Sequence, residues 1–386
     1  MRNVSIIGAA ETNFGILEGK TIRDIMAEAG TKAIEDSGLN SKDIQAFYLG
    51  NFAGSNFVGQ NHIAPYTASA LGLNHIPCTR LEDACASGGV ALREGVMAVA
   101  SGMYDFVLVG GVEKMTSVTT ERCTEILSGA ADEEFEARVG ITFPGLFALM
   151  ARRHMFEYGT TKKQLSMVAV KNHKNGAKNP YAQMRKEITL EKALNSVVIA
   201  DPLNLYDCSL VSDGAAAIVL CPANYAHEYS NIPIDVIGFG QSSDVISVSE
   251  RPSITVLQST VKASMEAYKM ANLKPQDIDV CEVHDCFTIS EIIATEDLGF
   301  VEKGKGGKAV EEGMTEIDGA IPINPSGGLK AKGHPVGATG ASQAVETVFQ
   351  LRGVAGERQV KNAEIGLIHN LGGSGSTCVV HILKRR

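Results

Sequence analysis

Four short segments of the sequence carry cysteine or histidine side chains, and three of the four are rich in glycine. They are 83–89 (DACASGG), 282–291 (EVHDCFTISE), 324–340 (NPSGGLKAKGHPVGATG) and 369–376 (HNLGGSGS). A thiol activated by an imidazole is a nucleophile that can accept an acyl group. Backbone N–H groups of a glycine-rich loop can stabilise the negative charge that develops on a carbonyl oxygen. These residue types therefore suit covalent acyl transfer.

Cys85 and His334 are the first candidates for that chemistry. Cys85 stands just before a predicted helix, where free N–H groups and the helix dipole would lower its pKa. The alternative is a core thiol, because free cysteines are usually buried. His334 lies in GHPVGATG, where the surrounding glycines fix an imidazole on a turn that enters a helix. The histidine pattern is the more specific of the two.

A strand–helix–strand order that could position these residues occurs twice in the chain. It is predicted for 3–8, 21–38 and 43–52, and again for 234–240, 257–273 and 277–287. Leu39 and Asp43 recur at the same spacing as Leu273 and Asp277. Further helix–strand pairs and closing strands follow in each half, at 91–111 and 214–220, and at 341–373 and 375–383. The sequence therefore predicts a duplicated layered α/β unit.

Residues 116–204 interrupt this pattern with more charge and weaker strand alternation, which predicts a helical, loop-rich insertion. The predicted domains are 1–115 together with 205–230, the insertion 116–204, and 231–386. Basic side chains of the insertion could meet the phosphates of a ligand or simply lie in solvent; they are Arg152, Arg153, His154, Lys162 and Lys163. The four segments fall where strands end or helices begin, the edge at which α/β sheets bind ligands.

Composition excludes several classes of protein. The chain has 386 residues, 44% of them hydrophobic and 20% charged, as expected of a folded protein with more than one core. A net charge of −9 argues against nucleic-acid binding. No stretch reaches the roughly 18–20 consecutive apolar residues of a membrane span, and the first residues predict a strand rather than a signal peptide. The eight cysteines form no CxxC pair, so we expect reduced thiols, no metal and a cytoplasmic protein.

Taken together, the four segments resemble the signature blocks of the thiolase superfamily, and the resemblance extends over essentially the whole chain. It implies two duplicated βαβαβαββ halves stacked in αβαβα layers, with an inserted loop domain. Two positions depart from the common thiolases. Those enzymes carry Asn-Glu-Ala-Phe where this chain has 284–287 (His-Asp-Cys-Phe), and a cysteine where it has Asn370. This pairing resembles the sterol-carrier-protein type and the archaeal thiolases.

The resemblance implies roles for these residues. Cys85 would be the nucleophile and His334 the base that activates it. Because the late cysteine is missing, Cys286 is the expected second acid/base, with a core thiol as the alternative. His284, with His334 or a water held by both, would form one oxyanion site, and the backbone N–H groups of Cys85 and Gly372 would form the other.

Other features of the same segments have simpler interpretations. The run 372–375 could also serve close helix–strand packing or phosphate binding, although the sequence has no P-loop Gly-Lys-Ser/Thr. Cys378 is interpreted as a structural thiol in a strand. Asp207 and Asp213 are interpreted as turn or cap residues.

The activity implied by the resemblance is that of an acyl-CoA acetyltransferase. Two acetyl-CoA molecules would condense reversibly to acetoacetyl-CoA and CoA through an acetyl-cysteine, feeding the mevalonate pathway. CoA thioesters are then substrates, and neither a resident cofactor nor a metal is expected. Alternatives are a 3-ketoacyl-CoA thiolase for longer chains, a condensing enzyme of the ketoacyl-synthase or hydroxymethylglutaryl-CoA synthase kind, and a non-catalytic scaffold. The GHPVGATG segment speaks against the condensing enzyme, and the presence of all four segments speaks against the scaffold.

Partners are also implied by the resemblance. The chain is expected to form a homodimer or homotetramer that binds acetyl-CoA and CoA. Archaeal relatives suggest docking with hydroxymethylglutaryl-CoA synthase through a small OB-fold zinc-ribbon protein. The insertion 116–204 is expected to hold the pantetheine arm of CoA, although the sequence does not identify the contacting residues.

Overall fold

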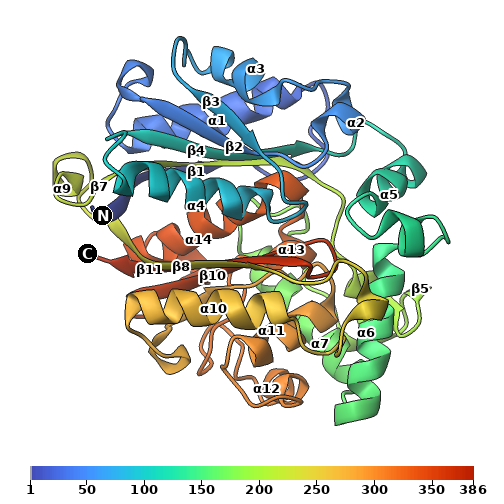
Figure 1. The fold of residues 1–386 in the computed structure, drawn as a ribbon. Coiled ribbons are helices and arrows are strands. Elements are labelled where there is room, and N and C mark those ends of the chain that lie inside the picture. Colours follow the sequence, from blue (N-terminus) through green and yellow to red (C-terminus); the bar gives the residue numbers. More distant parts are fainter. Residues whose placement is uncertain (1) are drawn as a thin grey trace.

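Five layers of helix and sheet make up the computed structural model, which describes residues 2–386 (Figure 1). Nine strands form one continuous sheet in the order β3-β2-β4-β7-β1-β8-β11-β10-β9. Strands β1 and β8 pair over only three residues each, and there the sheet turns into two facing halves. The strands of the first half are β1 (Val4–Glu11), β2 (Ala46–Gly50), β3 (Cys78–Leu81), β4 (Val107–Lys114) and β7 (Asp213–Pro222). Those of the second half are β8 (Ile234–Ser243), β9 (Val280–Glu282), β10 (Ile365–Gly372) and β11 (Thr377–Arg385).

The strand order confirms the predicted duplication. In the first half β2 runs parallel to β4, β4 runs antiparallel to β7, and β7 runs antiparallel to β1. In the second half β9, β10, β11 and β8 repeat the same three pairings. Even β3 has a counterpart, because Ile323 forms a parallel bridge to Cys281 beside β9. The αβαβα thiolase fold inferred from the sequence is the fold observed.

Helices cover the outer faces of the sheet and fill the space between its halves. Figure 1 shows α1 (Ile22–Asp36) and α3 (Ile63–Ala70) on one outer face, and α10 (Gln258–Ala271) and α11 (Thr288–Asp297) on the other. The inner layer holds α4 (Ser87–Ala100) and α14 (Thr339–Arg352). Because α14 has sheet on two sides, it is buried nearly all round. Small residues at the start of both inner helices allow their backbones to approach closely; they include Gly88, Gly89 and Gly340.

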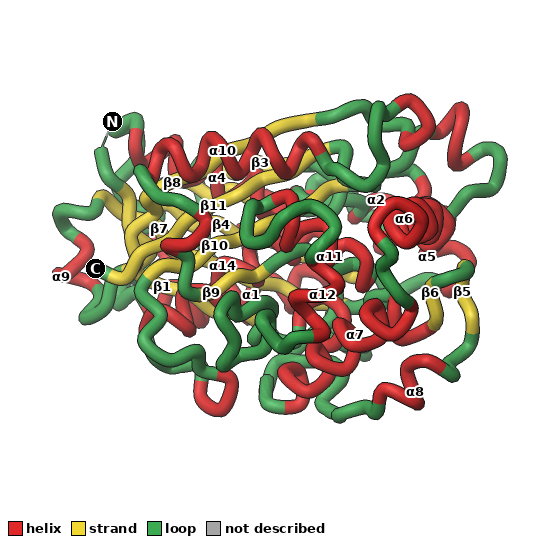
Figure 2. Tube along the Cα trace, turned by 90° about the horizontal axis from the view of Figure 1, so that it is seen from below, coloured by secondary structure: helices red, strands yellow, loops and turns green. Residues whose placement is uncertain are grey.

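The segment 116–204 is helical and loop-rich, as the sequence predicts. It contains α5 (Thr120–Ser128), α6 (Phe143–Tyr158), α7 (Lys162–Ala177), α8 (Leu190–Leu194) and the short strands β5 (Val198–Ala200) and β6 (Leu203–Asn204). Figure 2 shows these elements gathered at the end of the molecule away from both termini. The chain is joined there to the second half by a buried ion pair of 2.6 Å between Lys171 and Glu291. The division into three domains stays a prediction.

Several predicted boundaries need adjustment. The strand expected over 277–287 is confined to β9, because the chain turns after Glu282 into the loop that carries His284 and Cys286. The remaining helices are short: α2 (Gly54–Val58), α9 (Ala226–Tyr229), α12 (Gly306–Glu311) and α13 (Gly328–Ala331). Across residues 2–386, none of the helices combines the length and the apolar character that crossing a membrane requires.

Candidate active site

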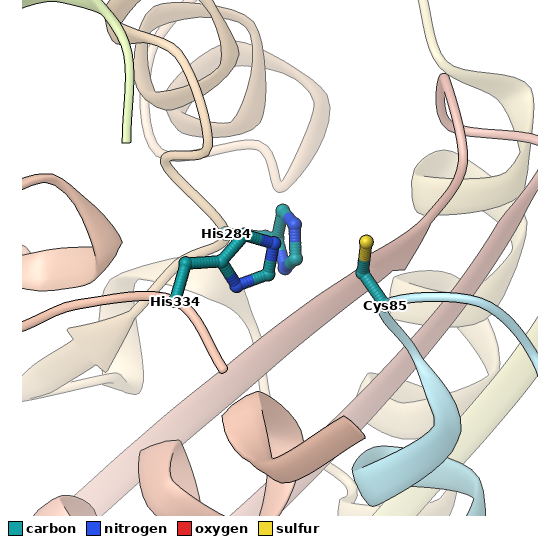
Figure 3. Close-up of side chains that lie close together, drawn as sticks. All are labelled: Cys85, His284 and His334. Atoms are coloured by element: carbon teal, nitrogen blue, oxygen red, sulfur yellow. The ribbon is translucent and has the colours of Figure 1, made fainter. Parts of the chain in front are cut away.

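Cys85, His284 and His334 come together between the two halves of the molecule (Figure 3). The sulfur of Cys85 and one ring nitrogen of each histidine lie within 4.8 Å of one another. The two imidazole rings are 5.0 Å apart between centroids and nearly perpendicular, at 86°. Cys85 comes from the first half, just before α4, whereas both histidines come from loops of the second half. The fold therefore assembles a thiol and two imidazoles from distant parts of the chain.

The backbone around Cys85 is held in an unusual turn. Ala84 has a φ of 49°, in the left-handed region that costs a residue with a Cβ roughly 1–2 kcal/mol. Ser87 stabilises the turn, because its hydroxyl accepts from the Asp83 N–H and donates to the Ala84 carbonyl. The backbone N–H groups of Gly373 and of Cys85 itself face the sulfur. This arrangement places the thiol at the start of α4.

His334 is positioned through its backbone and its ring. Its N–H donates to the Ser212 hydroxyl at 3.0 Å, and its Nδ1 lies 2.7 Å from Oγ1 of Thr339. The Thr339 hydroxyl donates to the Pro335 carbonyl, so it can only accept from Nδ1–H of the ring. Nε2 of neutral His334 then keeps a lone pair. That nitrogen has the form that a general base requires.

The pKa of the Cys85 thiol differs from the lowered value that the sequence predicts. Burial raises the pKa of the Cys85 thiol to about 12, and the negative charge of Glu113 adds to that rise. Burial also lowers the pKa of His334 to about 3. The prediction of a lowered Cys85 pKa is therefore wrong, since neutral His334 supplies no positive charge and the helix N-terminus does not offset desolvation. At rest, a neutral thiol faces a neutral imidazole.

A small apolar cavity lies over these groups. Besides the three residues of Figure 3, it is lined by Phe52, Leu127, Ala130, Phe143, Phe147, Ser209, Cys286, Phe287, Val336 and Gly373. Four of these lining residues come from the segment 116–204; they are Leu127, Ala130, Phe143 and Phe147. The cavity therefore suits a small apolar group held over the thiol.

The other cysteine candidates lie in different surroundings. Cys286 lines the cavity, is buried, and has a pKa raised well above its ordinary value by desolvation and by the nearby Cys85. Cys378 lies in β11 with its side chain fully buried, and it is not among the residues that line the cavity. The positions therefore agree with the roles expected from the sequence, and both roles stay predictions.

The two aspartates interpreted as turn or cap residues make such contacts. Asp207 accepts from the Asn204 N–H at 2.8 Å and from the Thr288 hydroxyl at 2.9 Å. Asp213, at the start of β7, accepts from the Thr116 N–H at 2.9 Å and pairs with Lys114 at 3.0 Å. Neither aspartate lines the cavity.

The N–H beside the thiol belongs to Gly373, the residue that follows the predicted oxyanion donor Gly372. Gly372 is the last residue of β10 and is paired with Thr377 of β11. At Gly373 the chain leaves the strand with a φ of 58°, which turns its N–H toward Cys85. The Gly373 N–H is therefore a further candidate donor at this site, and the oxyanion role of Gly372 stays a prediction.

Glu113 is a residue that the sequence analysis missed. Its buried carboxylate accepts from the Phe52 N–H at 2.8 Å and from the Gly337 N–H at 3.1 Å. It thereby ties the cavity wall to the loop that carries His334. Desolvation raises the pKa of Glu113 to about 7, although the backbone donors oppose that rise. Its sequence signal is a carboxylate near the end of an apolar strand, two residues after a pair of glycines.

The basic residues proposed to meet phosphates all have protein partners. His154 is fully buried, with its ring nitrogens 3.0 Å from Glu296 and 2.8 Å from Thr160. It is therefore a structural residue. The other four make surface contacts: Arg152 with Asp201, Arg153 with Glu157, Lys162 with Asn204, and Lys163 with Glu311.

Comparison with known proteins agrees with this geometry. Residues 4–224 match the family model of the thiolase N-terminal domain, and residues 240–385 match that of the thiolase C-terminal domain-like family. The chain belongs to the thiolase family. Sequence relatives of this thiolase include acetyl-CoA acetyltransferase of Methanothermobacter thermautotrophicus, 55% identical over 100% of both chains. Sterol carrier protein 2 of Bos taurus is 35% identical over 98% of this chain and 72% of its own length.

A solved structure resembles this thiolase over nearly its whole length. It is described as an Ltp2-ChsH2(DUF35) aldolase, with a TM-score of 0.88 and 26% identity over 99% of this chain and 98% of the other. The archaeal and sterol-carrier-protein relatives confirm the resemblance drawn from 284–287 and Asn370.

Proposed function

We propose that this thiolase is an acetyl-CoA acetyltransferase that condenses two acetyl-CoA molecules reversibly to acetoacetyl-CoA and CoA. The observation that carries the proposal is the group of Cys85 with two histidine nitrogens, all within 4.8 Å, at an apolar cavity. Full-length similarity to an archaeal acetyl-CoA acetyltransferase supports the choice of acetyl-CoA as substrate. CoA thioesters are substrates here, and the proposed steps use protein groups.

The first half-reaction transfers an acetyl group to the enzyme. Nε2 of His334 takes the proton of Cys85 as the sulfur attacks the thioester carbonyl carbon. The bond between that carbon and the CoA sulfur breaks, and the leaving thiolate receives the proton from His334. The N–H groups of Gly373 and Cys85 stabilise the carbonyl oxygen while it carries negative charge. The products are acetyl-Cys85 and free CoA.

The second half-reaction forms the carbon–carbon bond. Cys286, after giving up its own proton, takes one from the methyl carbon of the second acetyl-CoA. His284 donates to the oxygen of the resulting enolate. The enolate carbon attacks acetyl-Cys85, the carbon–sulfur bond breaks, and the Cys85 thiolate takes up a proton. The proton that Cys286 releases at the start is held on Nε2 of His334 and passes from there to the Cys85 thiolate, so the step balances.

The assembly and partners are part of this proposal. Strand β3 lies at an edge of the sheet, where unpaired backbone groups favour pairing with a second copy in a homodimer or homotetramer. The printed name of the Ltp2-ChsH2(DUF35) aldolase joins two components. That name supports a complex with a second protein. We propose that the second protein is a small OB-fold zinc-ribbon protein, through which hydroxymethylglutaryl-CoA synthase would dock and draw the product into the mevalonate pathway. We place these steps in the cytoplasm.

Substrate contact is proposed for the segment 116–204. Leu127, Ala130, Phe143 and Phe147 from this segment line the cavity. A pantetheine arm that delivers an acetyl group to Cys85 would pass beside them. We therefore propose that this segment holds the arm, whereas the residues that meet the phosphates of CoA are not assigned.

The test is a steady-state assay of the purified chain with acetyl-CoA, with acetoacetyl-CoA plus CoA, and with longer 3-ketoacyl-CoA substrates. We expect turnover in both directions with the short substrates, and radiolabelled acetyl trapped on Cys85. Cys85→Ala should abolish both signals. Turnover only with the longer 3-ketoacyl-CoA substrates would favour a 3-ketoacyl-CoA thiolase for longer chains. A lack of both turnover and trapped acetyl would favour a non-catalytic scaffold protein.

A further inference from the structure

We propose that Asn370 is a positioning residue that sets the tautomer of His284, so that the two departures from the common thiolase pattern form one functional unit. The effect of this tautomer on catalysis rests on the proposed function. The arrangement of the side chains stands independently of that function. Both residues are fully or almost fully buried.

The orientation of the Asn370 amide is fixed by two backbone groups at the start of α4. Its Oδ1 accepts from the Gly89 N–H at 3.1 Å, and its Nδ2 donates to the Cys85 carbonyl at 3.0 Å. A backbone N–H only donates and a carbonyl only accepts, so the oxygen and nitrogen of the amide cannot exchange places. The side of the Asn370 amide that faces the Cys85 carbonyl is therefore Nδ2, a hydrogen-bond donor.

The group that receives this N–H is His284. Nδ2 of Asn370 lies 3.2 Å from Nδ1 of the imidazole. Because the amide nitrogen can only donate, Nδ1 must hold a lone pair, and neutral His284 carries its proton on Nε2. Burial keeps the ring neutral by lowering the pKa of His284 well below its usual value. The His284 backbone N–H also donates to Nδ1 of His369 at 3.3 Å, which anchors the loop.

The two histidines of the site thus carry opposite tautomers. His334 donates from Nδ1 to Thr339 and keeps an acceptor at Nε2. Nε2–H of His284 has no acceptor among the protein groups of residues 2–386, and the residue lines the cavity. The resting site therefore offers a base to Cys85 and a hydrogen-bond donor to a thioester or enolate oxygen.

A cysteine at position 370 could not replace the amide. Its one S–H cannot accept from Gly89 while donating to both the Cys85 carbonyl and His284. A chain with histidine at position 284 therefore benefits from an asparagine at position 370, which explains why both differences occur together in this sequence.

Asn370→Asp is the test variant, because it keeps the shape and the acceptor for Gly89 but removes the donor. Its carboxylate would accept from Nδ1–H and place the lone pair of neutral His284 on Nε2. We expect kcat for condensation to fall by about 10²–10³, the usual cost of an oxyanion donor, with KM for acetyl-CoA changed by less than about threefold. An unchanged kcat would overturn the proposal.

The pH profile separates the tautomer from a merely structural effect. In Asn370→Asp, the imidazolium form of His284 still carries a proton on Nε2, whereas the neutral form does not. Activity of the variant relative to wild type should therefore fall as the pH rises through the pKa of that pair. The titratable groups that face His284 are Cys85, Cys286, His334 and His369. All four are shared with wild type, so a constant activity ratio across pH would contradict the proposal.

A double-mutant cycle with His284→Asn provides the matched control. If Asn370 acts through His284, Asn370→Asp should cost little in the His284→Asn background. Equal costs in both backgrounds would show that Asn370 only supports α4. Nitrogen-15 NMR of histidine-labelled protein gives a readout without turnover, with His284→Asn assigning the signals. We expect Nε2–H in wild type and Nδ1–H in Asn370→Asp at high pH. An enzyme without acetyltransferase activity would refute the proposed function while leaving the NMR result decisive for Asn370.

Discussion

Nδ1 of His334 lies 2.7 Å from the hydroxyl of Thr339, five residues later in the same turn and helix. Because that hydroxyl donates to the Pro335 carbonyl, the contact fixes both the plane of the imidazole and the nitrogen that carries its proton. The base of the proposed first half-reaction is therefore set by a residue that is not among those lining the cavity.

Thr339→Val should slow acetylation of Cys85 by roughly 10-fold to 100-fold, less than the 10²–10⁴ that loss of a whole general base costs. The reason is that Nδ1 loses its acceptor while the imidazole remains. Thr339→Ser retains the hydroxyl and should acetylate at nearly the wild-type rate. Rapid-quench measurement of acetyl-Cys85 after mixing with acetyl-CoA gives both rates. Equal rates for the valine variant and wild type would contradict the role of Thr339.

Alkylation of Cys85 by iodoacetamide should accelerate about tenfold per pH unit between pH 7 and 9. With a pKa raised to about 12, the thiolate fraction rises with pH throughout this range. Mass spectrometry of labelled peptides follows the rate. Cys78 and Cys208, which are also half-buried, serve as controls because acetyl-CoA should protect Cys85 alone. A plateau near pH 7 would instead indicate a thiolate–imidazolium pair.

Cys286→Ser should still form acetyl-Cys85 but lose condensation and thiolysis. The first half-reaction depends on Cys85 and His334. A serine hydroxyl in the same buried place exchanges protons far less readily than the Cys286 thiol, even though burial raises the pKa of that thiol. Cys378→Ser is the matched control, since Cys378 is buried in β11 away from the cavity. Stopped-flow acetylation and steady-state turnover are measured on both variants. Normal turnover in Cys286→Ser with failure in Cys378→Ser would reverse the assignment.

Gly340→Ala should destabilise the protein by about 1–3 kcal/mol, the usual cost of overpacking. A Cβ at this position would clash with the Asn370 side chain and the Gly89 backbone, where α14 meets α4. Gly145→Ala in α6 is the control, because its nearest neighbour would be 3.8 Å away. Denaturant unfolding of both variants compares their free energies. Equal free energies of unfolding for the two variants would mean that α4 and α14 can move apart without a loss of stability.

Much of the fold could be predicted because the information is local or repeated. Apolar periodicity marks the strands and helices, and the matched spacing of Leu39–Asp43 and Leu273–Asp277 reveals the duplication. The segments that bear Cys85, His284 and His334 could be brought to one edge by the fold class alone. Their convergence within 4.8 Å is what the structure adds.

Other parts of the site depend on three-dimensional detail. Whether Gly372 or Gly373 faces the thiol is decided by where β10 ends. The pKa of Cys85 depends on the balance between burial and a helix terminus, which neighbouring residues in sequence do not determine. Glu113 reaches Gly337 across the inner layer of the molecule, so no local pattern joins them.

The pairings of the first half recur in mirror order along the sheet in the second half, and this repetition has an evolutionary consequence. One copy of the repeated unit carries the thiol of the site and the other copy carries both imidazoles. Neither copy alone therefore contains all three side chains. If the two units were separate, identical chains, each chain would have to carry the thiol and both imidazoles. In one fused chain, the two units are always present in a one-to-one ratio, and each is at a high effective concentration for the other. Each copy of the fused chain can then accept substitutions that its twin could not tolerate. The asymmetry between Cys85 and His334 is the kind of specialisation that gene duplication followed by fusion permits.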